Sequence, residues 1–170
     1  MSGGIASQEA AGGAITAASS GAEYLTQTYA RGRALAEPMN WDAIKAAYGS
    51  YPLDDVGQHI YIDGFRATTG GRIDAALSLL RNAYVQAEGG STPKMTHITE
   101  IGWATTQVSE SIQATNLETA YARFRATPYV PRAYWFFLRD EPLAGLYFGL
   151  LRSNGKAKPA WTSYQTAANY

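Results

Sequence analysis

Hydrophobic positions along the chain follow two spacings, one helical and one strand-like. Apolar residues recur every three or four positions in five segments, which predicts helices over residues 22–33, 40–48, 73–88, 109–127 and 159–168. Short β-branched and aromatic runs lie between these segments and predict strands over residues 55–61, 95–101 and 130–138. Residues 2–6 and 146–151 are two further candidate strands.

Strands and helices alternate in this prediction, which indicates an α/β protein with a parallel sheet and right-handed crossovers. The run 133–138 is apolar throughout, as expected of a parallel strand buried on both faces. The three clear strands and the candidate strand over 2–6 give four strand–helix units. Four units are half of a (β/α)8 (TIM) barrel, whose usual length is about 250 residues.

Composition is that of one folded domain spanning residues 1–170. Hydrophobic residues make up 46% of the chain and charged residues 16%, which excludes a disordered protein. The net charge is zero and no block of Lys or Arg occurs, so we expect neither a nucleic-acid partner nor a membrane partner. Residues 1–5 lack the features of a signal peptide, which predicts a soluble, untargeted chain and leaves its compartment undetermined.

The sequence lacks the residues or motifs of several kinds of active site and binding site. Without cysteine the chain has no disulfide, thiolate zinc site or cysteine nucleophile, and its two histidines lack metal-ligand spacing. No Gly-x-Ser-x-Gly elbow, phosphate loop or dinucleotide-binding glycine pattern occurs. We therefore expect no metal and no cofactor.

Glu100 is the candidate with the most informative position. It follows the β-branched run His97-Ile98-Thr99 and precedes Ile101-Gly102-Trp103, so it lies near the carboxyl end of a predicted strand. Most glutamates are solvated or paired with arginine. At the carboxyl end of a parallel strand, where α/β proteins place their active sites, a carboxylate can instead act as a nucleophile or as an acid/base.

Four other side chains join Glu100 as candidates, together with a carboxylate that follows the last predicted strand. His59 and Tyr61 are two residues apart, so on a strand they share one face and can contact a substrate or orient the carboxylate. Trp103 and Trp135 are core residues or, alternatively, stacking surfaces for sugar rings. Asp140 belongs to a solvated turn or to the same ligand-binding edge.

Three motifs, in order, resemble the carboxyl-terminal half of the clan A retaining glycoside hydrolases, the cellulase and xylosidase type. They are Asp54-Asp55-Val56-Gly57-Gln58-His59-Ile60-Tyr61, Thr99-Glu100-Ile101-Gly102-Trp103 and Tyr134-Trp135-Phe136-Phe137-Leu138-Arg139-Asp140, followed by Gly149-Leu150-Leu151 and Lys156-Ala157-Lys158-Pro159-Ala160. The resemblance covers most of residues 50–165.

The resemblance implies strands five to eight of a (β/α)8 barrel. It assigns the nucleophile role to Glu100, the neighbouring subsite to His59 and Tyr61, and the sugar platform to Trp135. The acid/base glutamate of clan A ends strand four in an Asn-Glu pair, and no Asn-Glu pair occurs in this sequence. Hydrolysis with retention needs two carboxyl groups about 5–5.5 Å apart.

An open half barrel exposes sheet edges, and we expect it to expose an apolar inner face as well. The sequence therefore predicts a homodimer whose two copies complete eight strands across an apolar interface. The leading hypothesis is a glycoside-hydrolase-like protein that acts on or binds β-linked glycans through Glu100. The alternatives are an inactive half barrel or scaffold that self-associates, and a weak esterase-type hydrolase in the same cleft.

Overall fold

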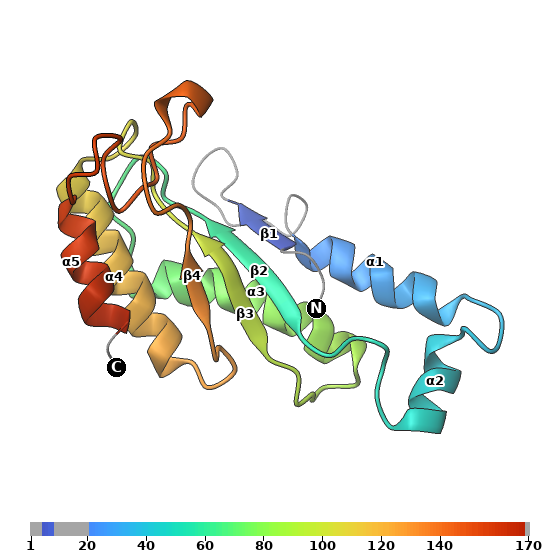
Figure 1. Ribbon diagram of the computed structural model, residues 1–170. Coiled ribbons are helices and arrows are strands. Elements are labelled where there is room, and N and C mark those ends of the chain that lie inside the picture. The colour runs from blue at the N-terminus through green and yellow to red at the C-terminus, as the bar shows by residue number, and fades with distance from the viewer. Residues whose placement is uncertain (1–4, 9–20, 169–170) are drawn as a thin grey trace.

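The computed structural model describes residues 5–8 and 21–168, and its centre is a four-stranded parallel sheet (Figure 1). The strands lie side by side in sequence order: β1 (Ile5–Gln8), β2 (Val56–Tyr61), β3 (Thr96–Ile101) and β4 (Ala133–Trp135). The α/β class and the parallel sheet predicted from the sequence are thus confirmed. Of the candidate strand over 2–6, residues 2–4 lie outside the described residues.

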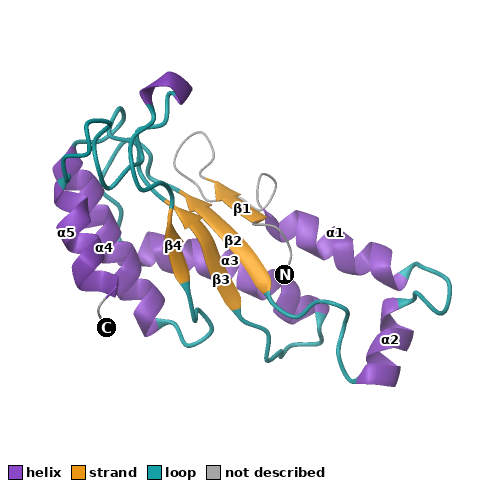
Figure 2. Cartoon of the chain, viewed as in Figure 1, coloured by secondary structure: helices purple, strands orange, loops and turns teal. Residues whose placement is uncertain are grey.

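Helices connect the strands, and Figure 2 shows them in purple around the orange sheet. They are α1 (Gly21–Arg33), α2 (Trp41–Tyr48), α3 (Gly70–Ala87), α4 (Glu110–Ala126) and α5 (Pro159–Ala168), with a short 3-10 turn, η1 (Pro142–Ala144). None of the described helices is long and apolar enough to cross a membrane.

Local capping explains where two of the helices begin. The Asn40 side chain accepts hydrogen bonds from the N–H groups of Asp42 and Ala43, both at 3.0 Å, so it is the N-cap of α2. Ser109 caps α4 in the same way by accepting from Ile112 N–H at 3.2 Å. These bonds fix the two helix starts without help from distant residues.

Four helices, α1, α3, α4 and α5, form one layer on one side of the sheet, and α2 lies beyond the sheet near the end of α1 (Figure 1). Helix α3 passes behind β2 and β3, α1 lies beside it toward β1, and α4 and α5 lie toward β4; neighbouring helices in this series contact one another. The core fills the space between this layer and the sheet, with Ile60, Ile98 and Leu117 almost fully buried. The sheet therefore has a helix-covered outer face and an opposite, inner face.

Along β2 and β3 the inner face is polar, which corrects the expectation of an apolar face for these two strands. Gln58 of β2 donates to the Ala76 carbonyl of α3 at 2.9 Å, so His59 and Tyr61 alternate with residues that face the helices. They lie on the inner side, as does Glu100, which contacts both. The hydrophobic residues of β2 and β3 lie on the outer face, where they pack against the helices.

β4 is much shorter than the predicted strand over 130–138, and it is not buried on both faces. Tyr134 is 50% exposed and Leu138 is 60% exposed. Phe137 has a φ of 77°, a left-handed conformation that ends the strand. The predicted extra strand over 146–151 is also absent from the described structure, where Leu146 and Leu151 form only isolated bridges.

Candidate functional site

Glu100 lies where the carboxyl ends of β2 and β3 meet. The pairing of these strands shifts by one residue, because Gln58 pairs with Ile98 whereas the next residue, His59, pairs with Glu100. Thr99 is thus an extra residue, a β-bulge, that turns the Glu100 side chain onto the inner face. The Glu100 side chain remains 32% exposed, so a ligand can reach it.

Two side chains of β2 hold the Glu100 carboxylate. Tyr61 Oη donates a hydrogen bond to Glu100 Oε2 at 2.6 Å, and His59 Nδ1 lies 3.3 Å from the same oxygen. Burial raises the pKa of the Tyr61 hydroxyl, and its hydrogen bond to Glu100 raises it further. Tyr61 therefore remains a neutral donor, and the three residues predicted to act together are brought together.

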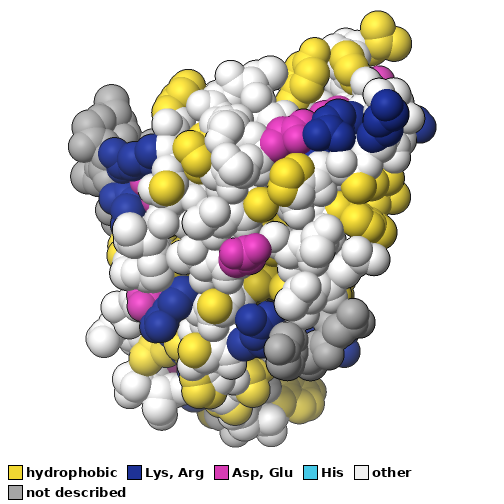
Figure 3. All heavy atoms as spheres, turned by 90° about the vertical axis from the view of Figure 1, so that its left-hand side faces the viewer, with side chains coloured by type: hydrophobic (Ala, Val, Ile, Leu, Met, Phe, Trp, Pro, Cys, Tyr) yellow, Lys and Arg dark blue, Asp and Glu magenta, His cyan; other side chains and the backbone are white. Residues whose placement is uncertain are grey.

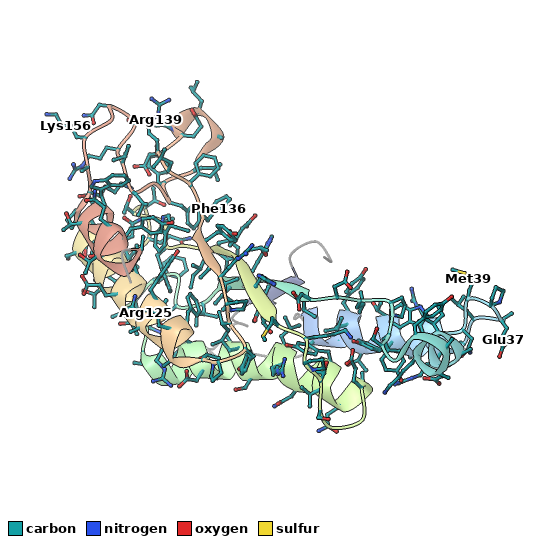
Figure 4. The ribbon with its side chains drawn as sticks, turned by 60° about the horizontal axis from the view of Figure 1, so that its bottom comes forward. Glu37, Met39, Arg125, Phe136, Arg139 and Lys156 are labelled. Atoms are coloured by element: carbon teal, nitrogen blue, oxygen red, sulfur yellow. The ribbon has the colours of Figure 1, made fainter. Side chains whose placement is uncertain are left out.

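Phe136 and Phe148 enclose the Tyr61 ring, and sequence reasoning did not identify either of them. Their rings meet Tyr61 edge to face, with centroids 6.0 Å and 6.1 Å away. Figure 4 places Phe136 at the end of β4, far from Glu37 and Met39 at the other end of the molecule. The signal was hidden because Phe136 belongs to a continuous apolar run in which no alternation shows which residue faces inward.

Trp103 and Trp135 have packing roles in this structure. Trp103 is only 1% exposed, and its Nε1 donates to the Ile62 carbonyl at 2.7 Å. Trp135 packs against Trp103 with ring centroids 6.0 Å apart and donates to the Phe148 carbonyl at 2.8 Å. Their burial and bonding place both indoles in or against the core, on the other side of β4 from Phe136.

Asp140 is a buried anchor. Its Oδ1 accepts hydrogen bonds from Lys158 Nζ and from Gly149 N–H, both at 2.8 Å, and neither charged side chain is appreciably exposed. Lys158 Nζ also donates to Thr105 Oγ1 at 3.0 Å. Asp140 therefore ties three chain segments together at the carboxyl end of the sheet, and its carboxylate is engaged within the protein.

A second histidine–carboxylate pair lies at the other end of the inner face. His97 Nε2 is 3.0 Å from Asp55 Oδ2, while Asp55 Oδ1 accepts the Met95 N–H at 2.8 Å. This pair joins the starts of β2 and β3. Within the described residues, no cluster of three or more His, Asp or Glu side chains could hold a metal ion.

This chain is similar in fold to several solved structures. No protein-family model and no curated protein matches this chain. Among solved structures, a GH5_18 protein from Bifidobacterium longum subsp. longum in complex with Manβ1-4GlcNAc superposes with a TM-score of 0.55 at 19% identity. That match covers 69% of this chain and 30% of the other.

Two further matches come from other glycoside hydrolase families. A GH128 endo-β-1,3-glucanase from Amycolatopsis mediterranei, in complex with laminarihexaose, has a TM-score of 0.54 at 20% identity over 73% of this chain and 48% of its own. A family 39 glycoside hydrolase from Bacteroides cellulosilyticus has a TM-score of 0.52 at 22% identity over 76% of this chain and 28% of its own.

These matches show that the fold is similar to part of these glycoside hydrolase structures, as the sequence motifs predicted. The chain spans less than half the length of each of these three proteins. At these identities the likeness concerns the fold alone. The chemistry has to be argued from the residues around Glu100.

Proposed function

We propose that this protein binds β-linked glycans and, with its barrel completed, cleaves them, with Glu100 as the nucleophile. The observation that carries the proposal is the hydrogen bond from Tyr61 Oη to Glu100 Oε2 at the carboxyl end of the sheet. In retaining hydrolysis the carboxylate attacks the anomeric carbon and forms a glycosyl–enzyme bond, which water then breaks. Both contacts from β2 go to Oε2, so Oε1 is the attacking oxygen in this proposal.

The leaving oxygen needs a proton from a second carboxyl group. In clan A the residue that supplies it ends strand four, before the strand that resembles β1, so we propose that it comes from the half that completes the barrel. The names of the structural neighbours support the substrate class, because one was solved with Manβ1-4GlcNAc and another with laminarihexaose.

We further propose that the completing half is a second copy of this chain. Within the described residues β1 pairs only with β2, and β4 pairs only with β3, so each edge is open to a further strand. Exposed hydrophobic residues beside the β4 edge support this, namely Tyr134, Leu138 and, on η1, Leu143 at 99% exposure. Hydrophobic side chains also gather at the top of the molecule in Figure 3, the end where Figure 1 places η1.

A homodimer would bring Glu100 of the partner subunit to the opposite wall of the cleft. If the two carboxyl groups are about 6.5–9.5 Å apart, the reaction inverts the anomeric configuration and Glu100 acts as the base. The anomer of the first-formed product, read by NMR, separates the two mechanisms. A stable monomer in light scattering at micromolar concentration would overturn the dimer.

The test of the function is a panel of 4-nitrophenyl β-glycosides and esters, assayed with wild type, Glu100→Gln and Asp55→Asn. We expect turnover of at least one glycoside, loss of that turnover in Glu100→Gln, and its retention in Asp55→Asn, which alters the carboxylate at the other end of the face. Ester turnover that is indifferent to Glu100 would identify the esterase alternative. No turnover together with thermal stabilisation by glycans would identify a binding module.

A further inference from the structure

The β-bulge between β2 and β3 has a side-chain hydrogen bond of its own. Thr99, the extra residue on β3, donates from Oγ1 to the Gln58 carbonyl at 3.3 Å. Gln58 is the last residue of β2 before the pairing shifts, and Glu100 is the first paired residue of β3 after the shift. The bond therefore joins the two strands at the step in register, immediately before the candidate nucleophile.

Hydrophobic packing does not decide how the bulge is arranged. Ile98 and Ile101, on either side of it, belong to the buried core, so β3 is held in place before and after the bulge. Thr99 and Glu100, which lie between them, are only partly buried. A bulge also disrupts the backbone hydrogen bonds around its extra residue. The arrangement of these two residues consequently depends on polar contacts such as the Thr99 hydroxyl makes.

The acceptor of this bond is itself held by the helix layer. The Gln58 side chain is buried, and its Nε2 donates to the Ala76 carbonyl of α3 at 2.9 Å. The position of Gln58 is thus fixed relative to α3, and a donor bonded to its carbonyl is fixed as well. The Thr99 hydroxyl therefore connects the segment that carries Glu100 to a rigid part of the fold.

Strand β2 also carries both side chains that contact the Glu100 carboxylate. Glu100 Oε2 lies 3.3 Å from His59 Nδ1 and 2.6 Å from Tyr61 Oη. A shift of the bulge relative to β2 would change both distances together. The hydrogen bond from Tyr61 is the more sensitive contact, because hydrogen bonds weaken steeply as their geometry departs from the optimum.

Threonine suits this position for two reasons. Its branched Cβ favours the extended backbone of a strand and restricts the side chain to few rotamers. Its hydroxyl can donate to a main-chain carbonyl. Valine has the branched shape without the donor, and serine has the donor without the branch, so a comparison of the three residues separates the hydroxyl from the shape.

We infer that Thr99 is a positioning residue, whose hydroxyl, bonded to the Gln58 carbonyl, sets the arrangement of the bulge and thereby the orientation of the Glu100 carboxylate. Thr99 acts through Glu100 and not on a substrate. The inference deepens the proposed function and rests on it for the effect on catalysis, whereas the surroundings of the Glu100 carboxylate can be measured without turnover.

The test compares wild type with Thr99→Val, which lacks the hydroxyl, and with Thr99→Ser, which keeps it. Thr96→Val is the matched control, because it makes the same change at the start of the same strand, where the buried Thr96 hydroxyl bonds to Tyr84 Oη at 2.7 Å. The measurements are kcat and KM on the best 4-nitrophenyl β-glycoside and the NMR signal of the Glu100 carboxyl carbon, assigned through Glu100→Gln. Circular dichroism checks that each variant folds.

We expect kcat to fall about tenfold in Thr99→Val with KM nearly unchanged, because a misplaced carboxylate attacks more slowly without weakening substrate binding. The Glu100 signal should shift in Thr99→Val. Thr99→Ser should keep most of kcat and a signal close to that of wild type. Thr96→Val should lower the melting temperature and leave both kcat and the Glu100 signal unchanged.

The outcomes separate the two proposals. Wild-type kcat together with an unchanged Glu100 signal in Thr99→Val overturns the positioning role and leaves the proposed function standing. Equal losses of kcat in Thr99→Val and Thr99→Ser also overturn it, because the hydroxyl would then not matter. If wild type turns over no glycoside, the proposed function is wrong, and the Glu100 signal alone decides whether Thr99 positions the carboxylate. Should Thr99→Val fail to fold, Thr99→Ala, which also lacks the hydroxyl, takes its place.

Discussion

The two histidines of the chain lie on the same face of the sheet, at opposite ends, and each is beside a carboxylate. His59 is 3.3 Å from Glu100, and His97 is 3.0 Å from Asp55. The remaining contacts differ. Asp55 also accepts a backbone N–H, from Met95, whereas Glu100 also accepts the side-chain hydroxyl of Tyr61.

This difference separates a structural pair from a candidate catalytic one. A carboxylate bonded to the backbone at the amino ends of the strands joins two chain segments, and that end of an α/β barrel serves stability. A carboxylate held by side chains at the carboxyl ends of the strands is oriented, but no backbone group depends on it as an acceptor. Contact between histidine and carboxylate is thus a poor marker of function, and the end of the sheet on which it lies is a better one.

Among the variants that test this comparison, the largest effect should come from removing the hydroxyl that orients Glu100. In Tyr61→Phe the ring and its contacts with Phe136 and Phe148 remain, but the hydrogen bond to Oε2 is lost. We expect kcat on a 4-nitrophenyl glycoside to fall about a hundredfold, the usual order for one preorganised donor, with the melting temperature nearly unchanged. A variant with full activity would contradict the assigned role of Tyr61.

The next effect concerns stability at the opposite end. Asp55→Ala leaves the Met95 N–H and the His97 ring without their shared acceptor, so the free energy of unfolding should fall by about 0.5–1.5 kcal/mol. Glu100→Ala, measured by the same urea titration, should cost less, because only side chains lose a partner there and no backbone N–H loses its acceptor. Equal losses of the free energy of unfolding in the two variants would contradict the distinction between the two pairs.

The smallest effect is the pH dependence of the stability that the structural pair contributes. The Met95 N–H, and next the His97 side chain, lower the pKa of the Asp55 carboxyl below its usual 3.8. A carboxyl whose pKa is lower in the folded state stabilises the fold above the unfolded pKa, and this contribution disappears as the pH falls through the folded value. The melting temperatures of wild type and Asp55→Asn should therefore converge between pH 6 and pH 2, and parallel curves would refute the assignment.

Part of this fold and site follows from the sequence because the signals are local. The N-cap at Asn40 and the β-branched run before Glu100 depend on neighbours only a few residues away. Two other features cannot be predicted from the sequence, and the first is the side of the sheet on which Glu100 lies. Strict alternation along β3 would put His97 and Glu100 on opposite faces, and only the bulge at Thr99, set by pairing with β2, brings them to one face.

The choice between Trp135 and Phe136 also lies beyond the sequence. Both belong to an apolar run without alternation. The sequence therefore does not show which of the two side chains packs into the core and which lies on the inner face. In the structure Trp135 fits against Trp103, and Phe136 therefore turns toward Tyr61. Tertiary packing decides which aromatic residue lies beside Tyr61, the residue that holds the Glu100 carboxylate.

The ammonium group of Lys158 has a consequence for affinity. Its bonds to Asp140, Thr105 and the Tyr147 carbonyl fasten together, during folding, loops that border Tyr61 and Phe148. Ordering such loops on association would cost about 0.5–1.5 kcal/mol for each immobilised side chain. Here that entropy is lost before any ligand arrives, so a ligand that contacts these loops, such as the glycan of the proposed function, would keep more of its contact energy as affinity.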